Sequence, residues 1–448
     1  MSMDVDSQQQ YEQRHAAGEE MLQWAKDLFP IHRSITGTGV RETLAYLQGL
    51  LPDLSVGKVT SGTEVFGWKV PQEWSVESAY IEDDQGNRII DLADHNLHLV
   101  GYAEPVDCWL SLQELQQHLY SLPDQPQAIP YVTSYYKRRW GFCLAHRQRE
   151  QLTEGQYHVV VQSQLFDGVL NYGELIIPGT TAEEVLLSTY VCHPSMANNE
   201  LSGPVLATAL ARWIRGLPDR RYTYRILFVP EAIGAISYLS LNHQVMKEQT
   251  IAGFVLSCVG DDRAYSMVPS RLGGTLADQM LKTVLTALDE SANVKYYSFL
   301  DRGSDERQYC SPGIEMPVVG FCRSHYSAYP EYHTSLDDFS VVTASGLQGA
   351  YEVMQSVLQL IEANVTYRMV TPCEPQLGRY EGLYSTLSFM QESVTESLEI
   401  TPREWLHLVT YADGNHDLAQ LSEVTKVHWR KVMEGMEKLY RLGLVSRD

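Results

Sequence analysis

The chain has 448 residues, 44% of them hydrophobic and 20% charged, and its formal net charge is −22. This composition is typical of a folded soluble protein, and the length exceeds the ~250–300 residues of a single hydrophobic core, which predicts two or three domains. The chain is acidic and has no cluster of Lys and Arg. We therefore expect no nucleic-acid partner, because binding to phosphates needs concentrated cationic side chains.

The sequence also limits the compartment in which the protein is expected. It has no stretch of about 18 apolar residues, and residues 1–13 are polar, so we predict neither a membrane partner nor a signal peptide. The seven cysteines are scattered and include no C-x-x-C pair, which favours a reducing compartment over a disulfide framework. A cytoplasmic location is the simplest expectation.

The first part of the chain changes character at about residue 59. Apolar residues at helical spacing predict helices over 8–28 and 40–51, and Arg33 in the intervening turn is interpreted either as a solvated residue or as a substrate-binding one. Short alternating segments over 59–170 predict an inserted antiparallel β domain. We expect its aromatic residues to serve the core and an interface rather than a binding platform. They are Phe66, Trp68, Trp74, Tyr135, Tyr136 and Trp140.

Strands and helices alternate from about residue 171, as in a layered α/β domain. This domain is predicted to comprise residues 1–58 and 171–368. Strands are expected at 173–177, 184–190, 224–230, 253–259, 295–298 and 317–321, and helices at 203–216, 233–241, 275–287 and 345–362.

Residues 369–448 are predicted to form a separate helical domain. Helices are expected at 383–397, 402–411, 418–425 and 427–442, with a turn at 413–417. Their order resembles a winged helix that lacks its wing. The candidate recognition helix mixes basic residues with Glu434 and Glu437, so we expect a packing or dimerising module, and a homo-oligomer, rather than a DNA reader.

A candidate metal site begins where the strand at 184–190 ends. His193 follows this strand, and the polar residues Asn198, Asn199 and Glu200 precede the helix at 203–216. Imidazole and carboxylate groups suit Zn²⁺, and ligands collect at strand ends in open α/β sheets. The alternative interpretation is structural, with His193 ending the strand and the polar residues capping the helix.

Further ionisable residues in loops of the α/β domain could complete this site. Each alone is an ordinary loop charge, but the set consists of carboxylates and a second imidazole, and several members follow predicted strands. We therefore predict that they converge with His193 on a shared cation. They are Glu231, Asp261, Asp305, Glu306 and His333.

Several blocks of the sequence resemble the co-catalytic zinc aminopeptidases of the M28 class. More closely, the chain looks like the aminopeptidase-like proteins with an inserted β domain and a C-terminal winged helix. This resemblance spans essentially the whole chain, and it implies a phosphorylase/hydrolase-like three-layer α/β/α domain that holds zinc at the carboxyl edge of its sheet. The blocks are His193 to Gly203, Val65-Phe66-Gly67-Trp68, Cys258-Val259-Gly260-Asp261 and Tyr332-His333-Thr334.

The resemblance also implies roles for particular residues. His193 and His333 match histidine ligands, Glu231 matches a ligand Glu, and Asp261 matches a ligand Asp. One or two zinc ions are expected.

Two positions depart from the pattern of the class. Where the peptidases place a metal-bridging Asp, this chain has Asn199, and where they have Glu-Glu it has Pro230-Glu231. An amide carries no charge to offset the repulsion between two dications, so one metal is expected unless Glu200 replaces the missing carboxylate as a ligand.

The sequence offers several candidates for the general base and for the residues that contact the substrate. Candidates for the base are Glu231, Asp305 and Glu306, because a base must reach the metal-bound water. The residues proposed to contact substrate offer amide, hydroxyl or guanidinium groups, although the arginines equally suit the balancing of an acidic surface. They are Asn199, Arg302, Arg307, Arg323 and Tyr326.

Three functions are consistent with these residues. The leading hypothesis is a zinc-dependent hydrolase that cleaves a peptide or amide bond in a small molecule or short peptide. The second is a deacylase or related tailoring enzyme in polysaccharide or natural-product biosynthesis. The third is a catalytically degenerate peptidase fold that serves as a binding or assembly module, as Asn199 and Pro230 suggest.

Overall fold

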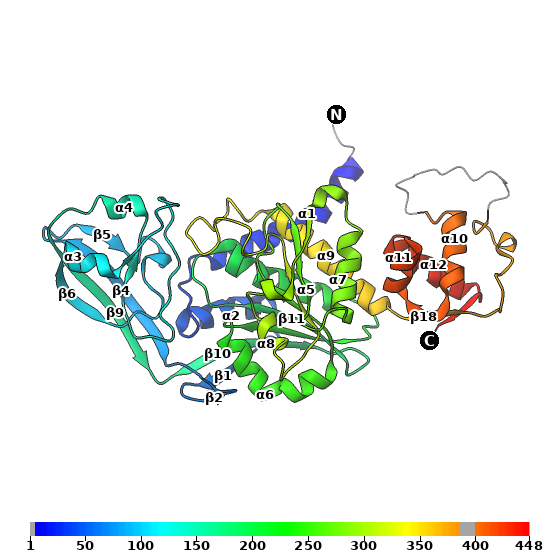
Figure 1. Ribbon diagram of the computed structural model, residues 1–448, viewed down its shortest axis with the longest axis horizontal. Helices are drawn as coiled ribbons and strands as arrows, with labels where there is room; N and C mark the ends of the chain where they lie inside the picture. Colours follow the sequence, from blue (N-terminus) through cyan, green and yellow to red (C-terminus); the bar gives the residue numbers. More distant parts are fainter. Residues whose placement is uncertain (1–4, 385–398, 448) are drawn as a thin grey trace. The chain divides into compact units, whose positions relative to one another are not determined.

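The computed structural model describes residues 5–384 and 399–447 (Figure 1). The chain divides into two compact units, of which the first comprises residues 1–277 and 295–352 and the second residues 278–294 and 353–448. Most of the helix predicted at 383–397 lies outside the described residues. None of the helices in the described ranges combines the length and the apolar character needed to span a bilayer.

The first unit is built around an eight-stranded sheet with the order β1-β10-β12-β11-β13-β16-β14-β15. The four strands β12, β11, β13 and β16 run parallel, whereas β1, β10 and β14 pair antiparallel with their neighbours. The bounds are β1 (Ser55–Thr60), β10 (Val169–Ile177), β11 (Glu184–Tyr190), β12 (Thr223–Val229), β13 (Thr250–Leu256), β14 (Tyr265–Val268), β15 (Val294–Tyr296) and β16 (Val318–Cys322).

Two neighbouring residues of β11 show that helices cover both faces of this sheet. Ser188 is hydrogen-bonded to the hydroxyl of Tyr309 at 2.9 Å, and Tyr309 belongs to α8 (Glu306–Tyr309). The next residue, Thr189, lies against Gly203 of α5 (Ser202–Arg215). Because successive side chains of a strand point to opposite faces, α5 and α8 lie on opposite sides of the sheet.

The other helices of this unit extend the two layers, as Figure 1 shows. Leu44 of α2 (Thr38–Leu50) lies close to Gly173 of β10, and Tyr238 of α6 (Ile233–Gln249) packs on the neighbouring Tyr172 with ring centroids 5.2 Å apart. Helix α1 (Val5–Leu28) packs against α5. The result is the three-layer α/β/α arrangement that was expected.

The strands that carry the candidate site are buried on both faces. All seven residues of β11 are buried, as expected for a central parallel strand covered by two helical layers. A π-helical turn, Ala197–Leu201, precedes α5, and all of its residues are buried. Turns of this kind are frequent at functional sites, and this one forces polar side chains into the interior.

The inserted segment carries its own four-stranded antiparallel sheet of order β5-β4-β9-β6. Its strands are β4 (Glu73–Asp83), β5 (Arg88–Asp91), β6 (Val106–Ser111) and β9 (Gln156–Phe166), and a separate hairpin comprises β2 (Glu64–Val65) and β3 (Trp68–Lys69). An isolated bridge between Pro130 and Thr334 connects this segment to the α/β domain directly beside His333, and the backbone N–H of Tyr131 donates to the oxygen of His333 at 2.9 Å.

The second unit has the elements of a winged helix. Strand β17 (Thr366–Met369) pairs with β18 (Asp413–Asp417) on one side and with β19 (Val445–Arg447) on the other. The expectation of a turn at 413–417 was therefore wrong, because these residues form strand β18, and β19 adds a third strand to the sheet. The helices are α10 (Pro402–Tyr411), α11 (Leu418–Thr425) and α12 (Trp429–Arg441), and α7 (Leu276–Thr286) and α9 (Ala344–Ala363) each belong partly to both units.

Basic residues of α12 have partners within the second unit. Lys431 forms an ion pair with Glu404 at 3.0 Å, and Arg441 forms one with Glu437 at the same distance. Lys438 lies over the ring of Trp405. These contacts use the cations that a DNA-reading helix would direct at phosphates, and the absence of a nucleic-acid partner stays a prediction.

The contact between β11 and α5 predicts that Gly203 cannot be replaced. A Cβ at this position would lie 2.2 Å from Thr189 Oγ1 and 2.4 Å from the backbone oxygen of Leu256. We expect Gly203→Ala to lower the free energy of unfolding by about 3 kcal/mol, because the helix must move off the sheet. The matched control is Gly49→Ala in α2, where a Cβ meets nothing within 4 Å, so the stability should rise by about 0.5–1 kcal/mol. Equal effects in urea denaturation would contradict this close approach.

Candidate metal centre

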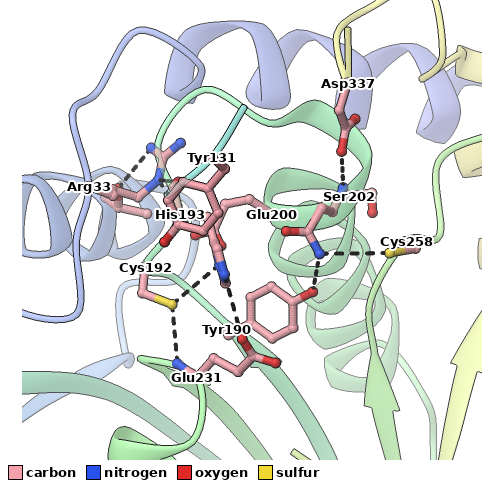
Figure 2. A network of polar contacts seen from close by, with 12 residues as sticks. Arg33, Tyr131, Tyr190, Cys192, His193, Glu200, Ser202, Glu231, Cys258 and Asp337 are labelled. Carbon is pink, nitrogen blue, oxygen red and sulfur yellow. Dashed lines mark hydrogen bonds and ion pairs between the residues drawn. The ribbon is translucent and has the colours of Figure 1, made fainter. Parts of the chain in front are cut away.

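His193 is held by a carboxylate behind its ring. Its Nδ1 donates a hydrogen bond to Glu200 Oε2 at 2.9 Å, and its Nε2 lies 3.5 Å from Glu231 Oε2 (Figure 2). The side chains of His193 and Glu200 are buried. A carboxylate on Nδ1 fixes the tautomer in which Nε2 has a free lone pair. Glu200 therefore orients the ring from behind and does not share the position that a ligand at Nε2 would occupy.

Arg33 contacts both His193 and Glu200. Its Nε donates to the backbone oxygen of His193 at 2.9 Å and lies 3.5 Å from Glu200 Oε1, and its Nη1 donates to the oxygen of Leu28 at 2.8 Å. Arg33 is 1% exposed. Burial lowers the pKa of its guanidinium, and the charge of Glu200 opposes this shift. The interpretation of Arg33 as a solvated residue was therefore wrong, whereas its role in substrate binding stays a prediction.

The second imidazole lies beside the first. The ring centroids of His193 and His333 are 5.6 Å apart, although the two residues are 140 positions apart in the chain. His333 Nε2 is buried and has no hydrogen-bond partner among the described residues. Burial and the neighbouring charge of His193 lower the pKa of His333 to about 3, so its ring is neutral at physiological pH. A buried neutral imidazole with an orphaned nitrogen is suited to bind a metal.

Aromatic residues enclose the two imidazoles. The ring of Tyr131, from the inserted segment, lies 5.1 Å from that of His193 and 5.2 Å from that of His333. Tyr332 stacks on His333 at 3.9 Å, and Tyr190 lies 5.2 Å from His193. The inserted segment therefore contributes a wall of the centre, which no spacing in the sequence predicted.

A pair of carboxylates completes the centre. Asp305 is 0% exposed, its Oδ1 accepts a hydrogen bond from the backbone N–H of Ala232 at 2.7 Å, and its Oδ2 has no partner among the described residues. Burial raises the pKa of Asp305, and the negative charge of Glu231 raises it further. Burial also raises the pKa of Glu231, although His193 opposes that shift. Two such carboxylates favour sharing one proton.

The backbone is strained at several points around the centre. Ser195, Ala232, Cys258 and His333 have φ angles of 44°, 60°, 52° and 57°, in the left-handed region that side chains other than Gly rarely adopt. Such conformations persist only where the surrounding structure enforces them, and they cluster at functional sites.

The donor set fits one metal ion. The rings of His193 and His333 lie 5.6 Å apart and Glu231 Oε2 lies 3.5 Å from His193 Nε2, and two imidazoles with one carboxylate are a typical catalytic zinc set. Cys192, His193 and Glu200 also bring ligand atoms within 4.8 Å of one another. That grouping is better explained by the 2.9 Å hydrogen bond between His193 and Glu200, and burial raises the pKa of the Cys192 thiol, which disfavours the thiolate that a metal needs.

Asn199 occupies the position at which the M28 aminopeptidases have a metal-bridging Asp. Its Nδ2 donates to the hydroxyl of Tyr190 at 2.7 Å, so the amide oxygen is the atom left without a partner in the described part of the chain. The side chain of Asp337 anchors the turn, because it accepts the backbone N–H groups of Asn198 and Asn199 at 2.6 and 2.9 Å. Burial raises the pKa of Asp337 to about 7, against the effect of these hydrogen bonds.

Asp337 was not among the residues singled out from the sequence, although it lies four residues after His333 in the recognised Tyr-His-Thr block. The sequence block that contains Asp337 was therefore recognised, but no function was assigned to its carboxylate. Cys192 and Tyr190 were equally overlooked, since a thiol and a phenol at the end of an apolar strand look like ordinary core residues.

The structure does not support Asp261 as a metal ligand. Its carboxylate accepts hydrogen bonds from Ser324 Oγ and N at 2.7 and 2.9 Å, from Arg263 N at 2.9 Å and from Asn198 Nδ2 at 3.2 Å. These four donors use its lone pairs. Asp261 therefore holds loops of the domain together. Glu200 Oε2 accepts the hydrogen bond of His193 Nδ1, while its Oε1 has no hydrogen-bond partner among the described residues, so the role of Glu200 as a ligand stays a prediction.

Other predicted residues also have structural partners. Arg323 is buried and donates to the backbone oxygens of Ala264 and Gly346, so it has no role in gripping a substrate. The hydroxyl of Tyr326 donates to Asp301 O at 2.6 Å, and Arg302 is exposed and donates to Phe299 O.

Glu306 and Arg307 directly follow Asp305 in the chain. Glu306 Oε1 accepts the N–H groups of Gly303 and Ser304 at 2.9 and 3.2 Å, while its Oε2, like Asp305 Oδ2, is buried without a hydrogen-bond partner among the described residues, so its role as a base stays a prediction. Arg307 is exposed, and its charge acts on Glu231 and Asp305. Of the predicted substrate-binding arginines, it is the one beside the centre.

Comparisons with known proteins identify the family. Residues 22–364 match the family model described as a domain of unknown function, DUF4910, and residues 365–447 match a winged helix-turn-helix model. The chain belongs to the DUF4910 family. A protein of Clostridium acetobutylicum, provisionally named as a polysaccharide biosynthesis protein with an aminopeptidase-like domain, is 38% identical over 432 residues, which are 96% of each chain.

Solved structures show the fold of this DUF4910 protein. The crystal structure of a provisionally assigned peptidase from Clostridium acetobutylicum has a TM-score of 0.89 at 35% identity and covers 99% of this chain and 100% of that one. A zinc aminopeptidase from Bacillus subtilis has a TM-score of 0.57 at 11% identity and covers 76% and 93%. The second likeness shows the fold alone. The predicted aminopeptidase-like α/β fold with a C-terminal winged helix is confirmed.

We expect the two histidines to be needed for metal binding. His193→Ala and His333→Ala each remove one nitrogen from the donor set, so zinc bound after purification without added metal should fall from about one ion per chain to less than 0.1. The control is His158→Ala, whose imidazole contacts Glu82 and Asp107 on the inserted sheet. Circular dichroism would check that each variant is folded. Stoichiometric zinc in both site variants would show that the ligand set is wrong.

Arg33 is expected to act on the metal through Glu200. Arg33→Met leaves the Glu200 carboxylate buried without its cation and weakens its hold on His193, so zinc affinity should fall about 10–100-fold. The matched control is Arg225→Met, because Arg225 forms a similar buried pair with Glu184 at 2.7 Å in the same sheet. Both variants should lose stability, but zinc competition titrations should detect weaker binding in Arg33→Met alone. Equal zinc affinity in the two variants would leave Arg33 a purely structural role.

Proposed function

We propose that this protein is a zinc-dependent hydrolase that cleaves an amide or peptide-like bond and uses one metal ion. The observation that carries the proposal is that the buried rings of His193 and His333 lie 5.6 Å apart, with Glu231 Oε2 3.5 Å from His193 Nε2 and with His333 Nε2 left without a hydrogen-bond partner among the described residues. These three residues would hold the zinc. When bound, zinc would polarise the scissile carbonyl and lower the pKa of a water molecule to about 7.

The residues of the chain then divide the remaining tasks. Glu200, backed by Arg33, holds the His193 ring in the tautomer that presents Nε2. Asp305 is the proposed general base, because its Oδ1 is fixed by Ala232 N–H while its buried Oδ2 is free to take a proton. Tyr131 and Tyr332 exclude water from the two imidazoles, which strengthens electrostatic interactions within the centre.

A second candidate narrows the substrate to an amide on a sugar. Its support is the relative that is 38% identical over 96% of the chain, whose name refers to polysaccharide biosynthesis. Removal of an N-acyl group uses the same activation of water as cleavage of a peptide. The two candidates differ in the substrate pocket rather than in the chemistry.

Asp305 provides a test that separates catalysis from metal binding. Asp305→Asn keeps an oxygen for the N–H of Ala232 but cannot take a proton, so kcat should fall about 10²–10⁴-fold with zinc content unchanged. Assays would use alanine p-nitroanilide for peptidase activity and N-acetylglucosamine oligomers for deacylation. Glu306→Gln tests the rival base and should retain most activity, since Glu306 anchors backbone N–H groups.

Full activity of Asp305→Asn would overturn the assignment of the base. Absence of both zinc and hydrolysis in the wild-type protein would overturn the enzymatic proposal and favour the binding-module hypothesis, for which Asn199 and Pro230 provide the support.

A further inference from the structure

Three aromatic side chains of the inserted segment are exposed, so they do not serve the core, which was one of the two roles expected for them beside an interface. The exposed fractions are 54% for Phe66, 40% for Trp68 and 68% for Tyr136. Trp74, by contrast, is buried at 4%. Large aromatic residues left in solvent have no stabilising role of their own, and they frequently mark binding sites.

The hairpin that presents two of these rings is strained at its tip. Val65 pairs with Trp68 across a two-residue turn, in which Phe66 and Gly67 have φ angles of 48° and 81°. Such a turn favours Asn followed by Gly, and a bulky Phe in the left-handed region costs energy. The exposed ring of Phe66 rests edge-on against His243 of α6 at 5.2 Å. The hairpin is therefore anchored on the α/β domain.

A chain of aromatic contacts leads from this hairpin to the metal centre. Trp68 meets Tyr136 edge-on with ring centroids 5.5 Å apart, and Tyr136 lies 6.3 Å from Tyr135. The hydroxyl of Tyr135 is 2.6 Å from that of Tyr131, and Tyr131 packs on His193 at 5.1 Å. The exposed rings thus adjoin the candidate active site, and all of these residues belong to the same compact unit.

Polar groups lie around the exposed rings. The side chains of Tyr136 and Arg307 donate no hydrogen bond to any described residue, and both are exposed. The two are electrostatic neighbours, because the charge of Arg307 acts on the hydroxyl of Tyr136. Glu231 also acts on Tyr136. The surface therefore combines open aromatic faces with unused hydroxyl and guanidinium donors.

We propose that Trp68 and Tyr136 form a subsite for a pyranose ring of a glycan substrate, next to the metal centre. A pyranose has apolar C–H faces that pack on aromatic rings and a rim of hydroxyl groups that need hydrogen-bond partners, and this surface offers both. An apolar peptide side chain would instead favour a closed apolar pocket. The inference rests on the proposed function and selects the sugar amide as its substrate class.

The test measures binding without turnover. In the His193→Ala background, the β-1,4-linked trisaccharides of N-acetylglucosamine and of glucose would be titrated by calorimetry and by saturation-transfer NMR. We expect at least one to bind, and Trp68→Ala or Tyr136→Ala to weaken the affinity at least tenfold, while Trp68→Phe retains most of it. The matched control is Trp109→Ala, because Trp109 is 53% exposed but stacks on His158 of the inserted sheet. This control should bind as tightly as the parent.

Two outcomes would overturn the subsite. The first is no binding of either trisaccharide. The second is binding that Trp68→Ala and Tyr136→Ala leave unchanged or that Trp109→Ala weakens equally. These results are separate from a failure of the proposed hydrolase, because the parent variant is already inactive. If the wild-type protein hydrolyses an amide but binds no sugar, the subsite is wrong and the hydrolase proposal stands. If it binds sugar at these residues but hydrolyses no amide, the subsite stands and the hydrolase proposal is wrong.

Discussion

The hydrogen bond between His193 Nδ1 and Glu200 is the interaction on which the centre depends. It selects the tautomer and aims Nε2 toward Glu231. It also requires Arg33, because a carboxylate in a fully buried position is costly without a compensating cation. Arg33 thereby connects its N-terminal turn to the candidate metal centre. The same guanidinium also donates a hydrogen bond to the backbone oxygen of His193.

The turn between β11 and α5 shows how the fold fixes this interaction. Its π-helical residues 197–201 direct Asn199 and Glu200 inward. Asp337 accepts two N–H groups of the turn, and Gly203 allows α5 to lie directly on Thr189 and Leu256. His333 precedes Asp337 by only four residues, so one loop supplies both an imidazole of the candidate centre and the anchor for the turn that positions the other imidazole.

Much of this architecture could be predicted because buried parallel strands have a strong sequence signature. The strand at 184–190 was predicted with its observed bounds. His193 was selected as a candidate because it follows this strand, and His333 because it is an imidazole in a polar loop of the same domain. Asp261 illustrates the limit. A carboxylate at a strand end has the same sequence signal whether it faces a metal or backbone N–H groups, and only the four donors around it decide. Arg33 was unpredictable for a related reason, since its partners lie about 160 positions away.

The charges around the centre argue for a single metal ion. Glu231 and Asp305 together favour one shared proton, so this pair carries about one negative charge to set against a metal dication. A second dication would need another free carboxylate. Glu200 is committed to His193 and Arg33, Asp261 and Asp337 are engaged by N–H and hydroxyl donors, and Asn199 offers only a neutral amide oxygen. A neutral amide at Asn199 offsets less of the repulsion between two dications than a bridging carboxylate would, which is the reason that one metal ion is proposed.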